Sequence, residues 1–72
     1  METTSIRLTI RNLPDHFDRT RISAVLDEIE LALMEERDIH CSTSADSFTI
    51  TIVVPTLRLV DVATCLKGIG LI

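Results

Sequence analysis

The sequence contains very few aromatic residues and very few glycines. Its 72 residues include no Trp, no Tyr and only two Phe, and both glycines lie near the C-terminus, at positions 68 and 70. Proteins that read single-stranded nucleic acid stack its bases on aromatic rings, so the shortage of rings argues against that function and against aromatic cages for cationic ligands. Without a glycine-rich loop, the sequence also excludes the common phosphate-binding loops.

Long apolar runs and paired cysteine motifs are also missing. A helix that spans a bilayer needs about 20 apolar residues, and no stretch of the sequence approaches that length. No hydrophobic leader follows the polar residues 1–5. Cys41 and Cys65 match no C-x-x-C or zinc spacing. We therefore expect a cytoplasmic protein with no membrane contact and two reduced, buried thiols, and a disulfide stays open if the fold brings the two cysteines together.

What the sequence does contain is enough apolar material for a core and an uneven distribution of charge. Hydrophobic residues make up 46% of the chain, which excludes a disordered acidic tail, and the length predicts a single domain over residues 1–72. The net charge is −4, and residues 22–46 alone carry seven acidic residues and one arginine, a net charge of −6. Proteins that bind phosphate backbones are usually basic, so nucleic acid is not the expected partner.

The first half of the sequence predicts a strand followed by a helix. In residues 5–11, Ile, Leu and Ile alternate with Arg, Thr and Arg, which is the period of a half-buried strand. Apolar residues then recur at helical spacing and predict a helix that begins at Asp18 or Thr20 and ends near Glu36. The inner face of this helix consists of Ile22, Val25, Leu26, Ile29 and Leu33.

The second half predicts a hairpin and a second helix. Residues 38–43 form a short strand, residues 44–47 a turn and residues 48–54 the most regular strand of the chain. Thr56 is a candidate N-cap for a helix that runs to Gly68, with an inner face of Leu59, Val62, Ala63 and Leu66. Residues 69–72 are a candidate for a very short final strand.

This order of elements predicts an α+β fold of the ferredoxin-like βαββα(β) type. The sheet is antiparallel, and both helices lie on one of its faces because such crossovers are right-handed. The side chains expected in the core from the strands are Ile6, Leu8, Ile10, Phe48, Ile50 and Ile52. The side chains expected on the open sheet face are Arg7, Thr9, Arg11, His40, Ser42, Thr49 and Thr51.

The sequence provides no pattern typical of a catalytic or metal site. His16 lies between Asp15 and Asp18, and His40 between Asp38 and Cys41, yet neither group has the spacing of a known metal site. No serine stands in a nucleophile-elbow context, and no residue set provides a nucleophile, a base and an orienting group. We therefore expect no enzyme, no catalytic residue, no bound metal and no cofactor.

Residues 8–14, Leu-Thr-Ile-Arg-Asn-Leu-Pro, resemble the first strand of an RNA-recognition motif. That family places an aromatic residue where Thr9 stands, and basic and aromatic residues on its third strand. The corresponding residues 45–52 contain one Phe and no basic residue. The resemblance therefore implies a ferredoxin-like first strand and does not imply RNA binding.

A second resemblance covers residues 6–70, which are similar to a small ACT domain, the regulatory module of many enzymes of amino-acid metabolism. The matching segments are residues 7–11, 14–15, 21–26, 42–44, 48–54 and 59–66, with Gly68. In that family an effector, often an amino acid, binds between paired domains, at the loop after the first strand and at the start of the second strand. The resemblance implies ligand contacts from Asn12, Asp15, Asp18, Asp38 and Ile39.

From these observations we expect a non-catalytic regulatory or binding module that forms a homodimer and takes an amino-acid effector. Two alternatives stay open. Glu28, Glu30 and Leu31 on the acidic helix predict a surface for a partner protein, in which case the chain is a small interaction module or inhibitor. Arg7 and Arg11, about 13 Å apart on one strand face, predict an anion or nucleic-acid surface, or are simply solvated.

Overall fold

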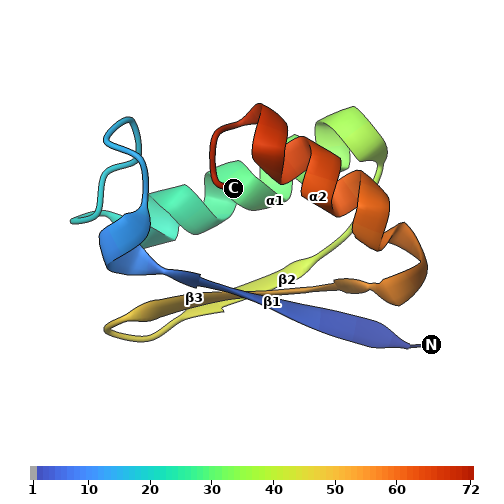
Figure 1. Cartoon of the computed structure of the whole chain (residues 1–72), viewed down its shortest axis with the longest axis horizontal. Helices are drawn as coiled ribbons and strands as arrows, with labels where there is room; N and C mark the ends of the chain where they lie inside the picture. The colour runs from blue at the N-terminus through green and yellow to red at the C-terminus, as the bar shows by residue number, and fades with distance from the viewer. Residues whose placement is uncertain (1) are drawn as a thin grey trace.

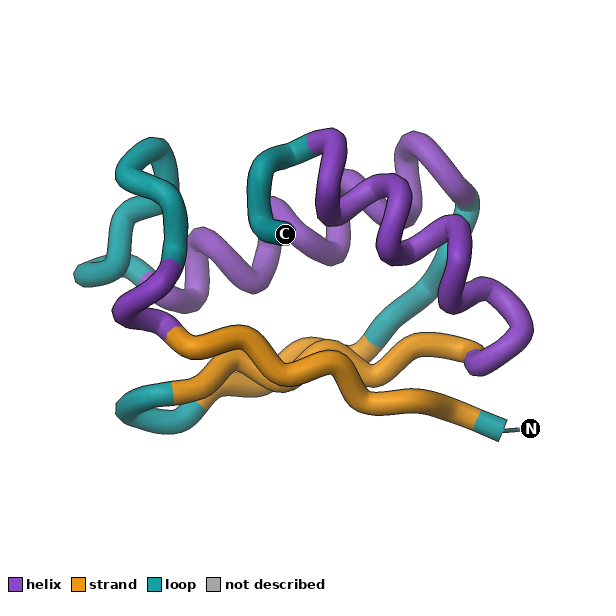
Figure 2. Tube along the Cα trace, in the orientation of Figure 1, coloured by secondary structure: helices purple, strands orange, loops and turns teal. Residues whose placement is uncertain are grey.

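The computed structural model describes residues 2–72 and consists of one sheet covered on one face by two helices (Figures 1 and 2). The sheet is antiparallel with the order β1-β3-β2. The elements are β1 (Thr3–Thr9), η1 (Ile10–Asn12), α1 (Ile22–Arg37), β2 (Ser42–Ala45), β3 (Thr49–Pro55), η2 (Thr56–Arg58) and α2 (Leu59–Gly68). This arrangement confirms the predicted α+β, ferredoxin-like fold.

The core lies between the sheet and the two helices, where alternating strand residues meet the helix stripes. Ile6 pairs with Ile52 and Leu8 with Ile50 across β1 and β3, and their side chains face the helices. The most deeply buried side chains come from α1, β3 and α2 and include Ile29, Leu33, Ile50, Ile52, Val62 and Leu66. The apolar stripe predicted for the first helix is confirmed, because Val25, Ile29 and Leu33 are buried and Ile22 and Leu26 pack against them.

The first helix begins at Ile22, later than the predicted start at Asp18 or Thr20. The side chain of Asp18 accepts hydrogen bonds from the backbone N–H and the hydroxyl of Thr20, at 2.9 and 2.5 Å, and so closes a turn instead of capping the helix. Because Leu13 and Phe17 are each only 3% exposed, the loop between β1 and α1 contributes to the core.

The second strand also begins later than predicted, at Ser42 instead of residue 38. Asp38 adopts the left-handed conformation, with φ of 54°, and its N–H donates to the end of α1. Residues 38–41 are therefore a connection from the helix to the sheet. The placement of His40 on the open face of a strand was wrong, since His40 lies in this connection.

Phe48 was predicted to lie in the core, and this was wrong, since 77% of its surface is exposed. It belongs to the turn between β2 and β3, where its N–H donates to the side chain of Asp46 at 2.8 Å. Leu13 and Phe17 of the β1–α1 loop are the aliphatic and aromatic side chains that the core buries instead. Strand β3 consequently begins at Thr49.

Residues 69–72 form no strand, so the short final strand was wrong. Gly70 has φ of +86°, a left-handed conformation that reverses the chain, and the N–H of Leu71 then donates to the carbonyl of Leu66 at 2.9 Å. Ile69 and Leu71 pack against the core as the tail folds back. As a result, the outer edge of β1 has no neighbouring strand within residues 2–72.

Candidate functional site

The five predicted ligand residues lie in two groups at opposite ends of α1. Asn12 lies on η1, and Asp15 and Asp18 lie in the loop that follows it, before the helix begins. Asp38 and Ile39 follow the last residue of the same helix. Because α1 has 16 residues, and a helix rises 1.5 Å per residue, about 24 Å separates the two groups. A single chain does not bring them together.

The loop group is occupied by local contacts. The hydrogen bonds from Thr20 hold the pKa of Asp18 below its ordinary value. Asp15 lies 3.7 Å from the guanidinium of Arg19, which also donates to the carbonyl of Leu13. Arg19 thus holds the loop against Leu13, and the carboxylate of Asp15 stays fully exposed beside it.

His16, in the same loop, connects it to the C-terminal tail. Its Nε2 lies 3.0 Å from the carbonyl oxygen of Ile69, and its ring packs on Phe17 with 4.3 Å between the ring centroids. A Cβ added to Gly70 would stand 3.0 Å from the His16 ring. The glycine therefore serves two needs at once, the left-handed turn and the close approach of the histidine.

The second group serves to end the helix. The N–H of Asp38 donates to the carbonyl of Met34, and the N–H of Ile39 donates to that of Leu33 at 3.1 Å. Ile39 is only 2% exposed and belongs to the core. Its backbone and side chain are thus both used within the chain, and only Asp38 of this pair is available at the surface.

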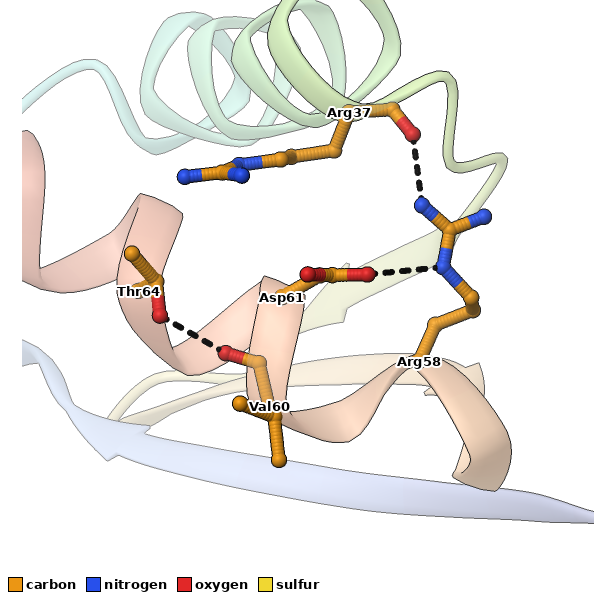
Figure 3. Close-up of polar contacts among 5 residues, drawn as sticks. All are labelled: Arg37, Arg58, Val60, Asp61 and Thr64. Atoms are coloured by element: carbon orange, nitrogen blue, oxygen red, sulfur yellow. Dashed lines mark hydrogen bonds and ion pairs between the residues drawn. The ribbon is translucent and has the colours of Figure 1, made fainter.

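Arg58, which the sequence did not single out, joins the two helices at this end of the molecule (Figure 3). Its Nη2 donates to the carbonyl of Arg37 at 2.8 Å, and its Nε donates to Asp61 Oδ2 at 3.0 Å. The guanidinium thus satisfies one of the carbonyls left free at the end of α1 and places a positive charge at the negative end of the helix dipole. The signal in the sequence was the Arg58–Asp61 pair at i, i+3.

Beside Arg58 lies a shallow, mostly apolar hollow of about 470 Å³. It is lined by Glu2, Pro55, Thr56, Leu57 and Arg58. Two hydrogen bonds hold η2 here, from Thr56 N to the carbonyl oxygen of Glu2, just before β1, at 3.1 Å, and between the hydroxyls of Thr56 and Thr4 of β1 at 2.7 Å. The hollow therefore lies at the junction of β1 and the start of α2.

The two arginines of the predicted interaction surface do not share a strand face. Arg7 is exposed on the open face of β1, whereas Arg11 lies on η1, because β1 ends at Thr9. The placement of Arg11 on the strand was therefore wrong. The open face around Arg7 consists mainly of hydroxyl residues, namely Ser5, Thr9, Ser42, Ser44, Thr49 and Thr51.

The residues predicted for the acidic helix surface also separate. Glu28 and Leu31 are exposed one turn apart on α1, and Leu31 is 54% exposed beside Met34 at 49%. Glu30 is half-buried on another side of the helix. There, burial and the charge of Glu30 both raise the pKa of Cys41. Glu28 and Glu30 therefore do not share one face of α1.

Both cysteines are free, so no disulfide joins them. The thiol of Cys65 on α2 lies 3.3 Å from Glu36 Oε2 on α1, and burial together with this carboxylate raises the pKa of Cys65. The two thiols are therefore protonated at neutral pH, since both pKa values lie above the ordinary value of 9.0. Within residues 2–72, no group of three or more His, Cys, Asp or Glu is arranged to hold a metal ion.

The outer edge of β1 is the surface that the sequence did not reveal, because its exposure depends on the missing final strand. Just beyond the two ends of β1, the N–H of Ile10 donates to the carbonyl of Phe48, and the carbonyl of Glu2 accepts from the N–H of Thr56. Because backbone groups alternate in direction along a strand, the even-numbered residues of β1 direct their N–H and C=O groups toward β3. The N–H and C=O groups of the odd-numbered residues therefore point outward. These residues are Thr3, Ser5, Arg7 and Thr9.

In the described part of the chain, the carboxylates of Asp18 and Asp46 and the imidazole of His16 thus make local contacts that hold turns and the tail in place. In the described residues, no helix has the length and apolar character needed to cross a membrane. Comparison of the chain with protein family models, with curated proteins and with solved structures finds no match.

Proposed function

We propose that this chain is a non-catalytic regulatory module that works as a homodimer. The observation that carries the proposal is the amount of apolar side chain left at the surface of so small a fold. Leu57 is 96% exposed, Val60 80% and Phe48 77%. Exposed apolar groups that lie close together mark interaction sites. Leu57 lies on η2 and Val60 three residues later at the start of α2.

The mass of the protein in solution tests the homodimer. Sedimentation equilibrium at about 100 µM, a concentration that populates even micromolar dimers, should give twice the 8.0 kDa of one chain. Dilution should return the mass to that of the single chain with one dissociation constant. A mass of one chain throughout this range would refute the proposal.

An amino-acid effector is the second candidate, and the fully exposed carboxylate of Asp15 in the loop after β1 supports it. Each chain presents Asn12, Asp15 and Asp18 at one end of α1, and Asp38 at the other. The proposed site is therefore the loop end, where the carboxylates of Asp15 and Asp18 attract the ammonium group of the effector. Asp38, about 24 Å away at the other end of α1, takes no part in it.

Thermal unfolding in the presence of free amino acids tests this second candidate. A ligand that binds only the folded dimer raises the melting temperature, and the rise grows with ligand concentration. The matched variant is Asp15→Asn, which removes an exposed carboxylate and should abolish the rise. If no amino acid at about ten millimolar changes the melting temperature, the effector proposal is refuted while the homodimer stands.

A further inference from the structure

The free edge of β1 differs from the opposite edge of the sheet in length and protection. β1 offers seven residues, contains no proline and carries one charged side chain, Arg7. At the other edge, β2 has four residues and ends beside Asp46. Natural edge strands that avoid pairing are short, charged or interrupted by proline, and by these criteria β2 is protected and β1 is not.

Apolar side chains stand directly beside this edge. Figure 1 draws α2 and β1 toward the viewer, with α1 and β2 behind them. The hydroxyl bond between Thr4 and Thr56 ties β1 to the residue that precedes Leu57. In Figure 3, the side chain of Val60 points from α2 in the direction of β1, and 80% of it is exposed. A strand added at the edge of β1 would cover these side chains as well as the free backbone groups.

We propose that the occupant of this edge is β1 of a second copy, paired antiparallel about a two-fold axis at Ile6. This inference rests on the proposed homodimer and specifies how it forms. Ile6 is the midpoint of the strand Thr3–Thr9, so this register uses all seven residues of both copies. The backbone of Ile6 points inward, and the outward groups of Ser5 and Thr3 meet those of the partner's Arg7 and the partner's Thr9.

The product is one continuous sheet with a single helix layer. Residues directly opposite each other in an antiparallel pair lie on the same face, so pairing Ile6 with the partner's Ile6 puts both cores on one side. Three strands from each copy give a sheet of the order β2-β3-β1-β1-β3-β2. The two α2 helices then stand side by side over the joint, with Leu57 and Val60 between them.

Charge favours both this edge and this register. The acidic segment lies on α1 and around β2, so pairing through β2 would bring two segments of net charge −6 together, whereas pairing through β1 holds them apart. With the axis at Ile6, Arg7 lies opposite the partner's Ser5. An axis moved to Arg7 would set two guanidinium groups opposite each other. In the proposed register, Glu2 lies opposite the partner's Ile10, next to the partner's Arg11.

Opposite charges placed at position 5 test the register. Ser5 is exposed and faces the partner's Arg7 in this arrangement. We expect Ser5→Glu to lower the dimer dissociation constant and Ser5→Lys to raise it, each by about two- to thirtyfold, because the two-fold axis places two such opposite pairs in every dimer. Both effects should shrink in 0.5 M salt. Equal effects of the two substitutions would overturn the proposed register.

Two disruptive variants test the edge itself. In Ser5→Pro an outward N–H is lost and no bond to β3 is broken, and Val60→Glu places a charge between the two α2 helices. Both should be monomeric at concentrations where the unmodified protein is dimeric. The matched control is Leu31→Glu, at another exposed apolar residue, on α1, and this variant should remain dimeric. Circular dichroism at each concentration confirms that the variants are folded.

The outcomes separate the two proposals. If the unmodified protein is monomeric, the homodimer fails and the β1 pairing fails with it. If the protein is dimeric but Ser5→Pro and Val60→Glu leave the dimer intact, while Leu31→Glu dissociates it, the homodimer stands and the pairing through β1 is wrong. If Ser5→Pro and Val60→Glu dissociate the dimer and Leu31→Glu does not, the result supports both the homodimer and the pairing through β1.

Discussion

At the scale of single residues, several side chains that resemble ligands turn out to be parts of turns. Asp38 ends α1 in a left-handed conformation, Asp18 closes a turn with Thr20, and Ile39 is buried. Asp and Asn are the residues other than glycine that adopt the left-handed conformation most readily. The same chemistry that makes a carboxylate a good ligand makes it a good partner for nearby backbone N–H groups.

Substitution of Asp38 distinguishes its role in the helix end from a role in binding. Asp38→Gly should raise the free energy of unfolding slightly, by about 0.5 kcal/mol, because glycine adopts φ of 54° without strain. Asp38→Val should lower it by about 1–2 kcal/mol, because a β-branched residue is strained there. Urea unfolding measures both. If the glycine and valine variants are equally stable, the conformation at this position contributes nothing to stability.

Asp46 should make the protein sensitive to acid. Its side chain accepts the N–H groups of Phe48 and Thr49, at 2.8 and 2.7 Å, and these bonds hold its pKa below the ordinary value of 3.8. A lowered pKa means that the stabilisation is present above pH 3.8 and is lost as the pH falls through the folded-state pKa. The melting temperature of the unmodified protein should therefore fall below about pH 4. Asp46→Asn, which cannot titrate, should show a smaller fall over the same range.

At the scale of elements, the periodic patterns in the sequence predicted which helices and strands form, but they did not predict the residues at which these elements begin and end. The helix stripe of α1 and the alternation in β3 were identified because burial imposes a period on the sequence. The ends depend on single side chains, such as Asp18, and on the backbone of Gly70. The final strand was expected from apolar residues 69–72, which instead pack on the core as a reversed tail. In this tail, the apolar Ile69 and Leu71 indicated contact with the core, and they left the conformation of the segment open.

The junction between the two helices should depend on Arg58. Arg58→Ala removes the bond to the Arg37 carbonyl and the ion pair with Asp61, and we expect a loss of about 1 kcal/mol, since the side chain is 41% exposed and water screens part of the interaction. Asp61→Ala removes the ion pair alone and should cost only a few tenths of a kcal/mol. Equal losses in the two variants would show that the bond to α1 is without effect. Guanidinium unfolding of each variant makes the comparison.

At the scale of the whole molecule, the fold class was predictable and the free edge of β1, the proposed binding surface, was not. The order of strands and helices follows from local patterns, so the α+β arrangement could be read from residues 5–67. The edge of β1 is free because residues 69–72 form no strand beside it. Asn12 and Asp38 lie far apart because the 16 residues of α1 separate them. Such relations between distant residues have no signature in a single sequence.

The distribution of charge over the whole molecule predicts weak interaction with nucleic acid. On the open sheet face, Arg7 is the one basic side chain among hydroxyl residues, and Arg11 lies apart on η1. One phosphate contact gives little affinity, and the acidic α1 repels a polyanion. A gel-shift assay at about 20 mM salt, with single- and double-stranded oligonucleotides, should show no retention at micromolar protein. Retention that Arg7→Ala abolishes would contradict this expectation.

The pairing of β1 with β3 also determines the order in which the strands can pair during synthesis of the chain. Thr9 pairs with Thr49 and Thr3 with Pro55, whereas β2 and β3 are joined by a short turn. During synthesis at about 5–20 residues per second, β1 therefore waits about 2–8 seconds before the residues that pair with it exist. The β2–β3 hairpin, whose contacts are local, closes at once when it emerges. If β1 pairs with a second copy as proposed, two nascent chains on one polysome can form that pair before either has formed its own β1–β3 pair.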